Sequence, residues 1–262
     1  RDRSVSRGLG DVYKRQVKDG YMVDSDLPHN CIFNKARTGC GGTSIALNNG
    51  ENYVVAVPTT ELIINKCSSN DRCFGLYGNF TPKLKKELSD YIQQHECRKI
   101  ICTYDKLPKL LALVDGKDYR LLVDEYHNFL KQYSFRDKAI DGVLDNFKAF
   151  KSFCFMSATP IETDLKPNVL DGVTEYVADW KEPLPICVLP YQTNKPYQFA
   201  ANVIGKYKMQ GCLEVNGHES REAYFFLNSV QEIAHIIRQC GLTNDNCRVI
   251  CANTSPVSYT HL

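Results

Sequence analysis

Short apolar runs alternate with stretches of helical periodicity along most of this 262-residue chain, and this alternation constrains the fold more than any other feature. One of the apolar runs, YVVAVP at 53–58, is rich in β-branched residues and ends in proline, which suits a buried parallel strand. The runs lie at 31–36, 53–58, 73–78, 99–104, 119–126 and 152–160, with helical patterns between them. Strands that alternate with helices predict an α/β fold in which helices cover both faces of a parallel sheet.

A proline-rich stretch interrupts this alternation. Residues 181–196 contain four prolines, which is typical of a connection between domains. Beyond it we expect a helix, a strand, a helix and a strand, which would begin a second α/β unit; they lie at 196–209, 222–228, 229–240 and 247–253. The expected organisation is a first domain over 17–182, a linker over 183–196 and a partial second domain over 197–255.

Both terminal segments resemble translated adapter sequence, so residues 1–16 and 256–262 are left out of the fold prediction. Their exclusion changes the charge balance. Residues 1–16 contain five basic and two acidic groups, a net charge of +3 against +2 for the whole chain, which leaves the remainder near −1. The basic character of the chain therefore does not itself indicate nucleic-acid binding.

Composition favours a cytoplasmic protein that does not associate with membranes. No run approaches the roughly eighteen apolar residues of a membrane span, and no apolar segment of a secretion signal stands near the start. The twelve cysteines contain no CxxC pair and lie mostly within apolar runs, so we expect buried, reduced thiols. His235, Cys240, Cys247 and Cys251 fit no familiar zinc spacing.

A glycine-rich turn, ARTGCGGTS at 36–44, lies between a predicted strand and a predicted helix. Such a turn directs successive backbone N–H groups at a phosphate, next to the positive end of a helix dipole. Gly39 and Gly41 allow the tight turn, and Thr43 is placed to contact Mg²⁺. A tight strand-to-helix turn without a ligand is the structural alternative.

Polar residues follow three further predicted strands. LLVDEYH at 121–127 places Asp124 and Glu125 at a strand end, where adjacent carboxylates can hold Mg²⁺ and activate a water. A solvated acidic strand end is the alternative. AVPTTEL at 56–62 and FMSATP at 155–160 place hydroxyl groups in the same way. Each segment is ordinary alone, and it is their order along the chain that is informative.

The order of these segments resembles superfamily 2 helicases and translocases of the DExH kind, whose domains are RecA-like P-loop NTPase folds. ARTGCGGT resembles motif I, VPTTEL motif Ia, TYDKL at 103–107 motif Ic, DEYH motif II, SAT motif III, and YFFLNSV at 224–230 motif IV. The resemblance spans about residues 28–253. It implies two RecA-like domains with ATP between them, and single-stranded or duplex nucleic acid across the top.

The resemblance also implies a role for each motif residue. ATP would be bound by Thr38, Gly39, Cys40, Gly41, Gly42, Thr43 and Ser44. Mg²⁺ would be held, largely through water, by Thr43 and Asp124. Glu125 would polarise the attacking water, and nucleotide state would be coupled to the nucleic acid by His127, Ser157, Ala158 and Thr159. The nucleic-acid backbone would contact Pro58, Thr59, Thr103 and Tyr104.

Two departures from the family pattern affect the expected activity. Gly42 stands where the family has the lysine that neutralises the β- and γ-phosphates. Lys35 lies seven residues earlier, is expected on the strand, and is not expected to replace it. Nothing resembles motifs V and VI, which contain the arginine fingers, so we expect a C-terminally truncated chain that is a poor ATPase. Lysine-lacking loops of this kind occur in helicase-like proteins of large tailed phages, which favours a phage or mobile-element origin.

Three hypotheses follow. An ATP-dependent helicase or translocase is favoured by the intact carboxylate pair. An ATPase-deficient RecA-like module that binds nucleotide or nucleic acid as a scaffold is favoured by Gly42. A purely structural domain would make all six motif resemblances coincidental.

Overall fold

The computed structural model describes residues 11–13, 17–18, 21–180, 190–215, 218–220 and 223–249. The chain divides into two compact units, Arg1–Pro183 and Leu184–Leu262. Each unit is described by itself.

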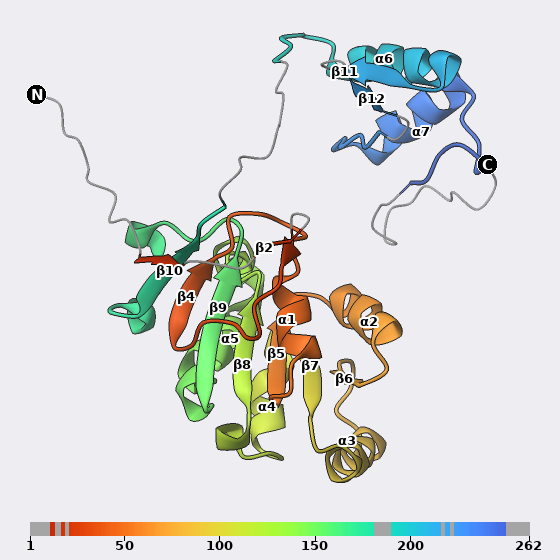
Figure 1. The fold of residues 1–262 in the computed structure, drawn as a ribbon. Helices are drawn as coiled ribbons and strands as arrows, with labels where there is room; N and C mark the ends of the chain where they lie inside the picture. Colours follow the sequence, from red (N-terminus) through yellow and green to blue (C-terminus); the bar gives the residue numbers. More distant parts are fainter. Residues whose placement is uncertain are drawn as a thin grey trace, which may run out of the picture. The chain divides into compact units, whose positions relative to one another are not determined.

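The first unit is built on one parallel sheet (Figure 1). Its strand order is β1-β10-β4-β9-β8-β5-β7-β6, and every neighbouring pair is parallel. The strands are β1 (Asp11–Tyr13), β4 (Cys31–Asn34), β5 (Tyr53–Val57), β6 (Cys73–Leu76), β7 (Lys99–Thr103), β8 (Arg120–Asp124), β9 (Ser152–Ser157) and β10 (Thr174–Ala178). The predicted α/β fold with a parallel sheet is confirmed.

Helices cover both faces of this sheet because the central strands are apolar on both sides. Alternate strand residues enter two separate cores: Val54 packs with α3 (Pro82–Gln94), α4 (Leu107–Leu111) and α5 (Asn128–Asn146). Its neighbour Val55 packs with α1 (Gly42–Asn48) and α2 (Thr60–Ser69). Short 3₁₀ turns lie at Tyr104–Lys106, Gly116–Asp118, Phe147–Ala149, Thr163–Leu165 and Asn168–Leu170.

The start of one helix was predicted correctly, and the start of another was not. The Thr81 side chain accepts a hydrogen bond from the backbone N–H of Leu84 at 3.2 Å, and Pro82 occupies the first turn of α3, as predicted. The helix predicted over 136–150 instead begins at Asn128 as α5. It has one non-helical residue, Arg136, at φ −137°. The predicted start thus marks a kink rather than a terminus.

Three strand features were not predicted. β10 inserts between β1 and β4, and its half-buried residues Glu175, Tyr176 and Val177 lack the apolar run of a central strand. β1 lies within the segment expected to be adapter-like, and it pairs with β10. A short antiparallel pair, β2 (Val17–Lys18) with β3 (Tyr21–Met22), precedes β4.

The second unit contains α6 (Pro196–Gln210), the antiparallel strands β11 (Leu213–Val215) and β12 (His218–Ser220), and α7 (Val230–Cys240). Ala200, Ala201 and Ile204 of α6 pack against Ile236 of α7. The strand predicted over 222–228 is wrong, because residues 223–228 form no strand and Phe226 is 94% exposed. An apolar run becomes a strand only where a neighbouring strand accepts its hydrogen bonds, and no described strand of this unit pairs with it.

Some predictions fall partly outside the described residues. In the strand predicted over 247–253, residues 247–249 are not a strand, and 250–253 lie outside. In the predicted linker, 183–189 lie outside, whereas 190–195 have no regular structure. Within the described part of the chain, no helix combines the length and apolar character needed to cross a membrane.

Candidate functional site

Three segments that are distant in sequence meet at the carboxyl edge of the sheet. The 36–44 turn follows β4, residues 124–127 end and follow β8, and Ser157 ends β9. β8 and β9 are adjacent, and β9 lies beside β4. A pocket of about 750 Å³ opens there, and its lining includes residues 21–25, 39–45, Lys35, Lys66, Asp124 and Glu125.

Thr43 and Asp124 join the glycine-rich turn to β8. The Thr43 hydroxyl donates to Oδ2 of Asp124 at 2.7 Å, and both side chains are buried. Burial raises the pKa of Asp124, although the Lys35 ammonium and the Thr43 hydroxyl oppose the shift. A hydroxyl and a carboxylate oxygen are therefore paired at the bottom of the pocket.

The turn itself has the conformation that its glycines allow. Gly39 and Gly41 have positive φ values of 65° and 87°, which residues with a Cβ rarely adopt. The Cys40 carbonyl accepts a hydrogen bond from the Met22 N–H at 2.9 Å, which fastens the turn to β3. Thr38, near the start of the turn, and Ser44, at its end, are exposed.

Gly42 is glycine for a different reason. Its φ is not positive, but a Cβ there would lie 2.6 Å from Sδ of Met156 and 3.1 Å from Cε of Met22. Met156 is fully buried in β9. Two methionine side chains therefore fill the space beside Gly42, the position at which the family pattern has a lysine.

Lys35 does not lie on the strand, where it was expected from the sequence. It follows the last residue of β4, and its ammonium enters the pocket. Nζ lies 2.7 Å from Oε1 of Glu125 and 3.7 Å from Oδ1 of Asp124, with 7% of the side chain exposed. Burial opposes the charge, but the two carboxylates outweigh it and raise the pKa of Lys35.

The backbone around this ion pair is strained. Glu125 has a φ of 53° and Ala36, directly after Lys35, a φ of 57°. Left-handed backbone at non-glycine residues is uncommon and clusters at functional sites. The backbone N–H of Glu125 also donates to Oδ1 of Asp124 at 3.0 Å.

His127 lies between the acidic pair and the end of β9. Its Nδ1 is 2.8 Å from Oγ of Ser157 and 3.2 Å from Oε2 of Glu125. Ser157 Oγ also accepts from the backbone N–H of Thr159 at 3.0 Å, and Ala158 lies half-buried between these two residues. The structure thus brings together the residues expected from motifs II and III.

The four residues expected to contact nucleic acid are not equally accessible. Only Thr59 is exposed, whereas Pro58 and Thr103 are buried. Tyr104 is fully buried, and its hydroxyl donates to the Asp124 carbonyl at 2.7 Å. The Tyr104 side chain is therefore not accessible to a nucleic acid in this structure, and the contact expected for this residue stays a prediction. The position matched a motif, but the ring turns inward and supports the Asp124–Glu125 turn.

Two further supports were missed by sequence reasoning. Trp180 donates its indole N–H to the Lys35 carbonyl at 2.8 Å, and the Arg37 guanidinium lies 4.2 Å above its ring. No local pattern links positions so far apart in sequence. The only available signal is that Trp180 is the single tryptophan of the chain.

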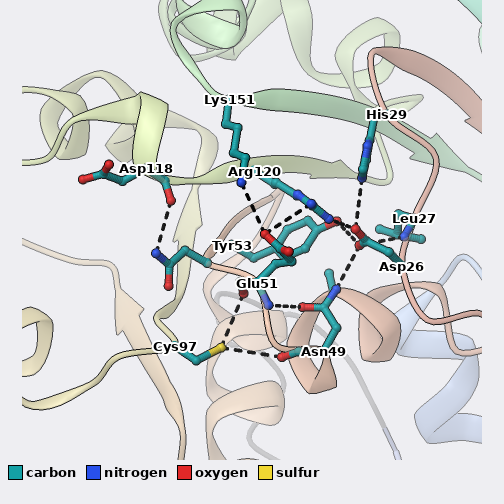
Figure 2. A network of polar contacts seen from close by, with 12 residues as sticks. Asp26, Leu27, His29, Asn49, Glu51, Tyr53, Cys97, Asp118, Arg120 and Lys151 are labelled. Carbon is teal, nitrogen blue, oxygen red and sulfur yellow. Dashed lines mark hydrogen bonds and ion pairs between the residues drawn. The ribbon is translucent and has the colours of Figure 1, made fainter.

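The second support is a polar network at the amino ends of β5 and β8 (Figure 2). Asp26 accepts hydrogen bonds from the Tyr53 hydroxyl at 2.5 Å and the Asn49 amide at 2.9 Å. Arg120 pairs with both Asp26 and Glu51. The network fastens the segment that contains Asp26 to the sheet, and residues 21–25 of this segment form one wall of the pocket.

Within the described residues, the pocket included, no group of three or more His, Cys, Asp and Glu side chains is arranged to bind a metal ion. The described cysteines are all free thiols. Cys251, named with His235 in the sequence analysis, lies outside the described residues.

Known proteins resemble this chain at two levels. The family model described as DEAD/DEAH box helicase matches residues 27–166. A search of curated proteins found no match. Among solved structures, a DEAD box protein from the hyperthermophile Methanococcus jannaschii is 17% identical, with a TM-score of 0.42, covering 67% of this chain and 52% of that protein.

Two further solved structures are similar. A hypothetical ATP-dependent RNA helicase from Sulfolobus tokodaii is 19% identical, with a TM-score of 0.43, covering 58% of this chain and 48% of that one. The yeast DEAD-box splicing factor Prp28 is 13% identical, with a TM-score of 0.40, covering 67% and 48%. The chain thus spans about half the length of these proteins.

The matched region contains the glycine-rich turn, the carboxylate pair and the Ser157 loop, which the fold brings to one sheet edge. It also covers more than half of the sequence. The resemblance to superfamily 2 helicases and the RecA-like fold are confirmed, and the chain belongs to the DEAD/DEAH box helicase family.

Proposed function

We propose that this chain binds Mg²⁺-ATP in the pocket at the carboxyl edge of the sheet, and that it forms part of an ATP-dependent nucleic-acid helicase or translocase. The observation that carries the proposal is the 2.7 Å contact between Thr43 and Asp124, which unites motif I with motif II. Lys35 and Glu125 line the same pocket, so cationic, acidic and hydroxyl groups converge where a phosphate chain would lie.

The residues of this pocket fit Mg²⁺. Mg²⁺ prefers oxygen ligands, keeps several waters, and is usually held by one or two carboxylates together with substrate phosphates. Thr43 Oγ1 and Asp124 Oδ2 supply such oxygens side by side. When bound, the ion would neutralise negative charge on the phosphates.

Glu125 is the residue suited to activate a water. Oε1 is held by Lys35, and Oε2 lies 3.2 Å from Nδ1 of His127, so the carboxylate is oriented from both sides. Positioned carboxylates accept a proton from an attacking water in this class of reaction. His127 contacts Ser157 as well, which gives the acidic pair a direct connection to β9.

A scaffold that binds nucleotide without hydrolysis is the second candidate. It is favoured by the Lys35–Glu125 ion pair, because the lysine occupies Oε1, one of the two carboxylate oxygens that would accept the proton. Gly42 adds to this, because it leaves the turn without the lysine of the family pattern. Among the four residues expected to contact nucleic acid, Thr59, which follows β5, is the exposed one. Both candidate functions include binding of a nucleic-acid strand.

The test is calorimetric titration of the 262-residue chain with ATP, with and without Mg²⁺. We expect binding that requires Mg²⁺, and we expect Asp124→Asn to remove the Mg²⁺ dependence. The exchange Asp145→Asn, on exposed α5 surface, is the control. The proposal would be refuted if the unaltered chain did not bind ATP. It would also be refuted if the unaltered chain and Asp124→Asn both bound ATP equally well with and without Mg²⁺.

A further inference from the structure

A lysine at position 42 of the glycine-rich turn would require two methionine side chains to shift. A side chain at position 42 would meet Met156 and Met22, which are both buried. The turn residues 36–44 contain one cationic side chain, Arg37, and its guanidinium lies over the Trp180 ring. A cation next to the turn is therefore a candidate to meet the phosphate charge.

Lys35 is placed to meet it. Its backbone is fixed at both polar groups, since its N–H donates to the Ser157 carbonyl at 2.9 Å and its carbonyl accepts from Trp180 at 2.8 Å. Its ammonium lies in the same pocket as the turn and within 3.7 Å of Asp124. An ammonium has three donors, and the contact with Glu125 uses one of them.

A neutralising role toward the two carboxylates is the simpler explanation of this geometry. Neutralisation alone does not explain why Lys35 lines the same pocket as Gly39 and Gly41, the glycines that shape the turn. The left-handed Ala36 directly after Lys35 begins that turn immediately. This arrangement places the lysine at the base of the turn rather than on the strand.

We propose that Lys35 replaces the missing turn lysine and contacts the β- and γ-phosphates of bound ATP. The inference rests on the proposed ATP site and deepens it. In the nucleotide-bound state Lys35 would bridge phosphate oxygens and Glu125, and so tie the position of the carboxylate to the presence of the phosphates. Lys35 would then both bind the phosphates and position the Glu125 carboxylate.

The experiment compares ATP, ADP and AMP by calorimetry with Mg²⁺ on the 262-residue chain. Lys35→Met alone would leave the buried Asp124 and the half-buried Glu125 without their cation, so the comparison is made between Glu125→Gln and Glu125→Gln/Lys35→Met. We expect ATP affinity to fall by about tenfold to a hundredfold, the size of a lost charge-assisted hydrogen bond, and AMP affinity to stay unchanged. Lys35→Arg, which keeps the charge, should retain most of the ATP affinity.

Two lysines serve as comparisons. Lys166 pairs with Glu175 at 2.8 Å and its side chain is 9% exposed, so it matches Lys35 in burial and pairing but does not line the pocket. Lys166→Met should leave ATP affinity unchanged. Lys66 does line the pocket, and an ATP-specific loss in Lys66→Met that is absent in the Lys35 variants would assign the phosphate contact to Lys66 and overturn the inference.

The remaining outcomes separate this inference from the proposed function. If the unaltered chain binds Mg²⁺-ATP but the Lys35 exchange changes ATP and AMP affinity equally, or changes neither, the ATP site stands and the Lys35 inference is overturned. If the unaltered chain binds no ATP, both are overturned. Unfolding temperatures of all variants, recorded alongside, show whether a loss of affinity follows from a loss of folded protein.

Discussion

Gly42 lies against Met156 so closely that a Cβ on the glycine would come within 2.6 Å of the methionine sulfur. The two residues belong to the segments that resemble motifs I and III. Their contact links the turn to β9 through packing rather than through a hydrogen bond. It also explains the glycine without reference to backbone conformation, because φ of Gly42 is not in the left-handed region.

The first prediction concerns this contact. Gly42→Ala should lower the free energy of unfolding by about 1–3 kcal/mol, because the buried methionines must move to admit the methyl group. Gly42→Lys should destabilise further and should not raise ATP affinity. Gly50→Ala is the matched control, since a Cβ there meets nothing within 4 Å. Urea unfolding measures all three, and equal stability of the two alanine variants would contradict the packing argument.

The second prediction concerns Tyr104. Tyr104→Phe keeps the buried ring but removes the hydroxyl that donates to the Asp124 carbonyl. The free energy of unfolding should fall by about 0.5–1.5 kcal/mol, and Mg²⁺-ATP affinity should fall with it because the Asp124–Glu125 turn loses its support. Tyr133→Phe removes an exposed hydroxyl with a 3.3 Å contact to Asp141 and should change neither.

A result in which Tyr104→Phe weakens nucleic-acid binding while stability and ATP affinity are unchanged would support the original motif-based role. That role came from matching a sequence position to a motif. A motif match gives the position of a residue along the chain but not the direction of its side chain, and here the ring is fully buried.

The third prediction separates turnover from binding. Glu125→Gln keeps the shape of the side chain but removes the base, so phosphate release should fall on the order of a hundredfold or more while ATP affinity is largely kept. Glu87→Gln, an exposed position on α3, is the control for the exchange itself. Unchanged turnover in Glu125→Gln would exclude Glu125 as the base and favour the scaffold.

The fourth prediction concerns protonation of His127. Burial lowers its pKa below the ordinary 6.5, while Glu125 opposes the shift and Lys131 and Lys35 add to it. The ring resonance that disappears in His127→Gln should therefore titrate below pH 6.5 in the folded chain. Glu125→Gln should lower the pKa further, because it removes a charge that favours the imidazolium.

The sign for stability follows from linkage. The unfolded chain binds the proton near pH 6.5, whereas the folded chain binds it only at lower pH. The contribution of neutral His127 to the free energy of unfolding is therefore complete above the unfolded pKa, and it is lost as the pH falls toward the folded pKa. A folded-state titration at or above pH 6.5, measured by NMR, would contradict the burial that the structure shows.

The sequence predicted the central strands because burial on both faces favours apolar runs, as in Tyr53–Val57 and in the Ile100–Cys102 centre of β7. It missed β10, where Thr174 is exposed and the next three residues are half-buried. The wrong strand over 222–228 shows the converse, since apolar residues there find no neighbouring strand among those described.

The site could be predicted only as far as spacing allows. The order of the motifs placed Thr43, Asp124 and Ser157 after strands, and parallel strands bring their carboxyl ends to one edge. The contact between Lys35 and Glu125 joins residues 90 positions apart, and whether a long side chain turns into a pocket depends on packing that no local pattern encodes. Lys35 was therefore not expected from the sequence to replace the lysine missing at Gly42, whereas the fold places both residues at the same pocket.

Trp180 has a consequence for how this molecule can be observed. It is the single tryptophan in 262 residues, and it touches the proposed ATP site twice, through the Lys35 carbonyl and through the Arg37 side chain of the turn. Any ligand that repositions the turn changes the surroundings of the one indole that emits. Nucleotide binding should therefore be readable from intrinsic fluorescence, with no dye attached and with Trp180→Phe as the silent reference.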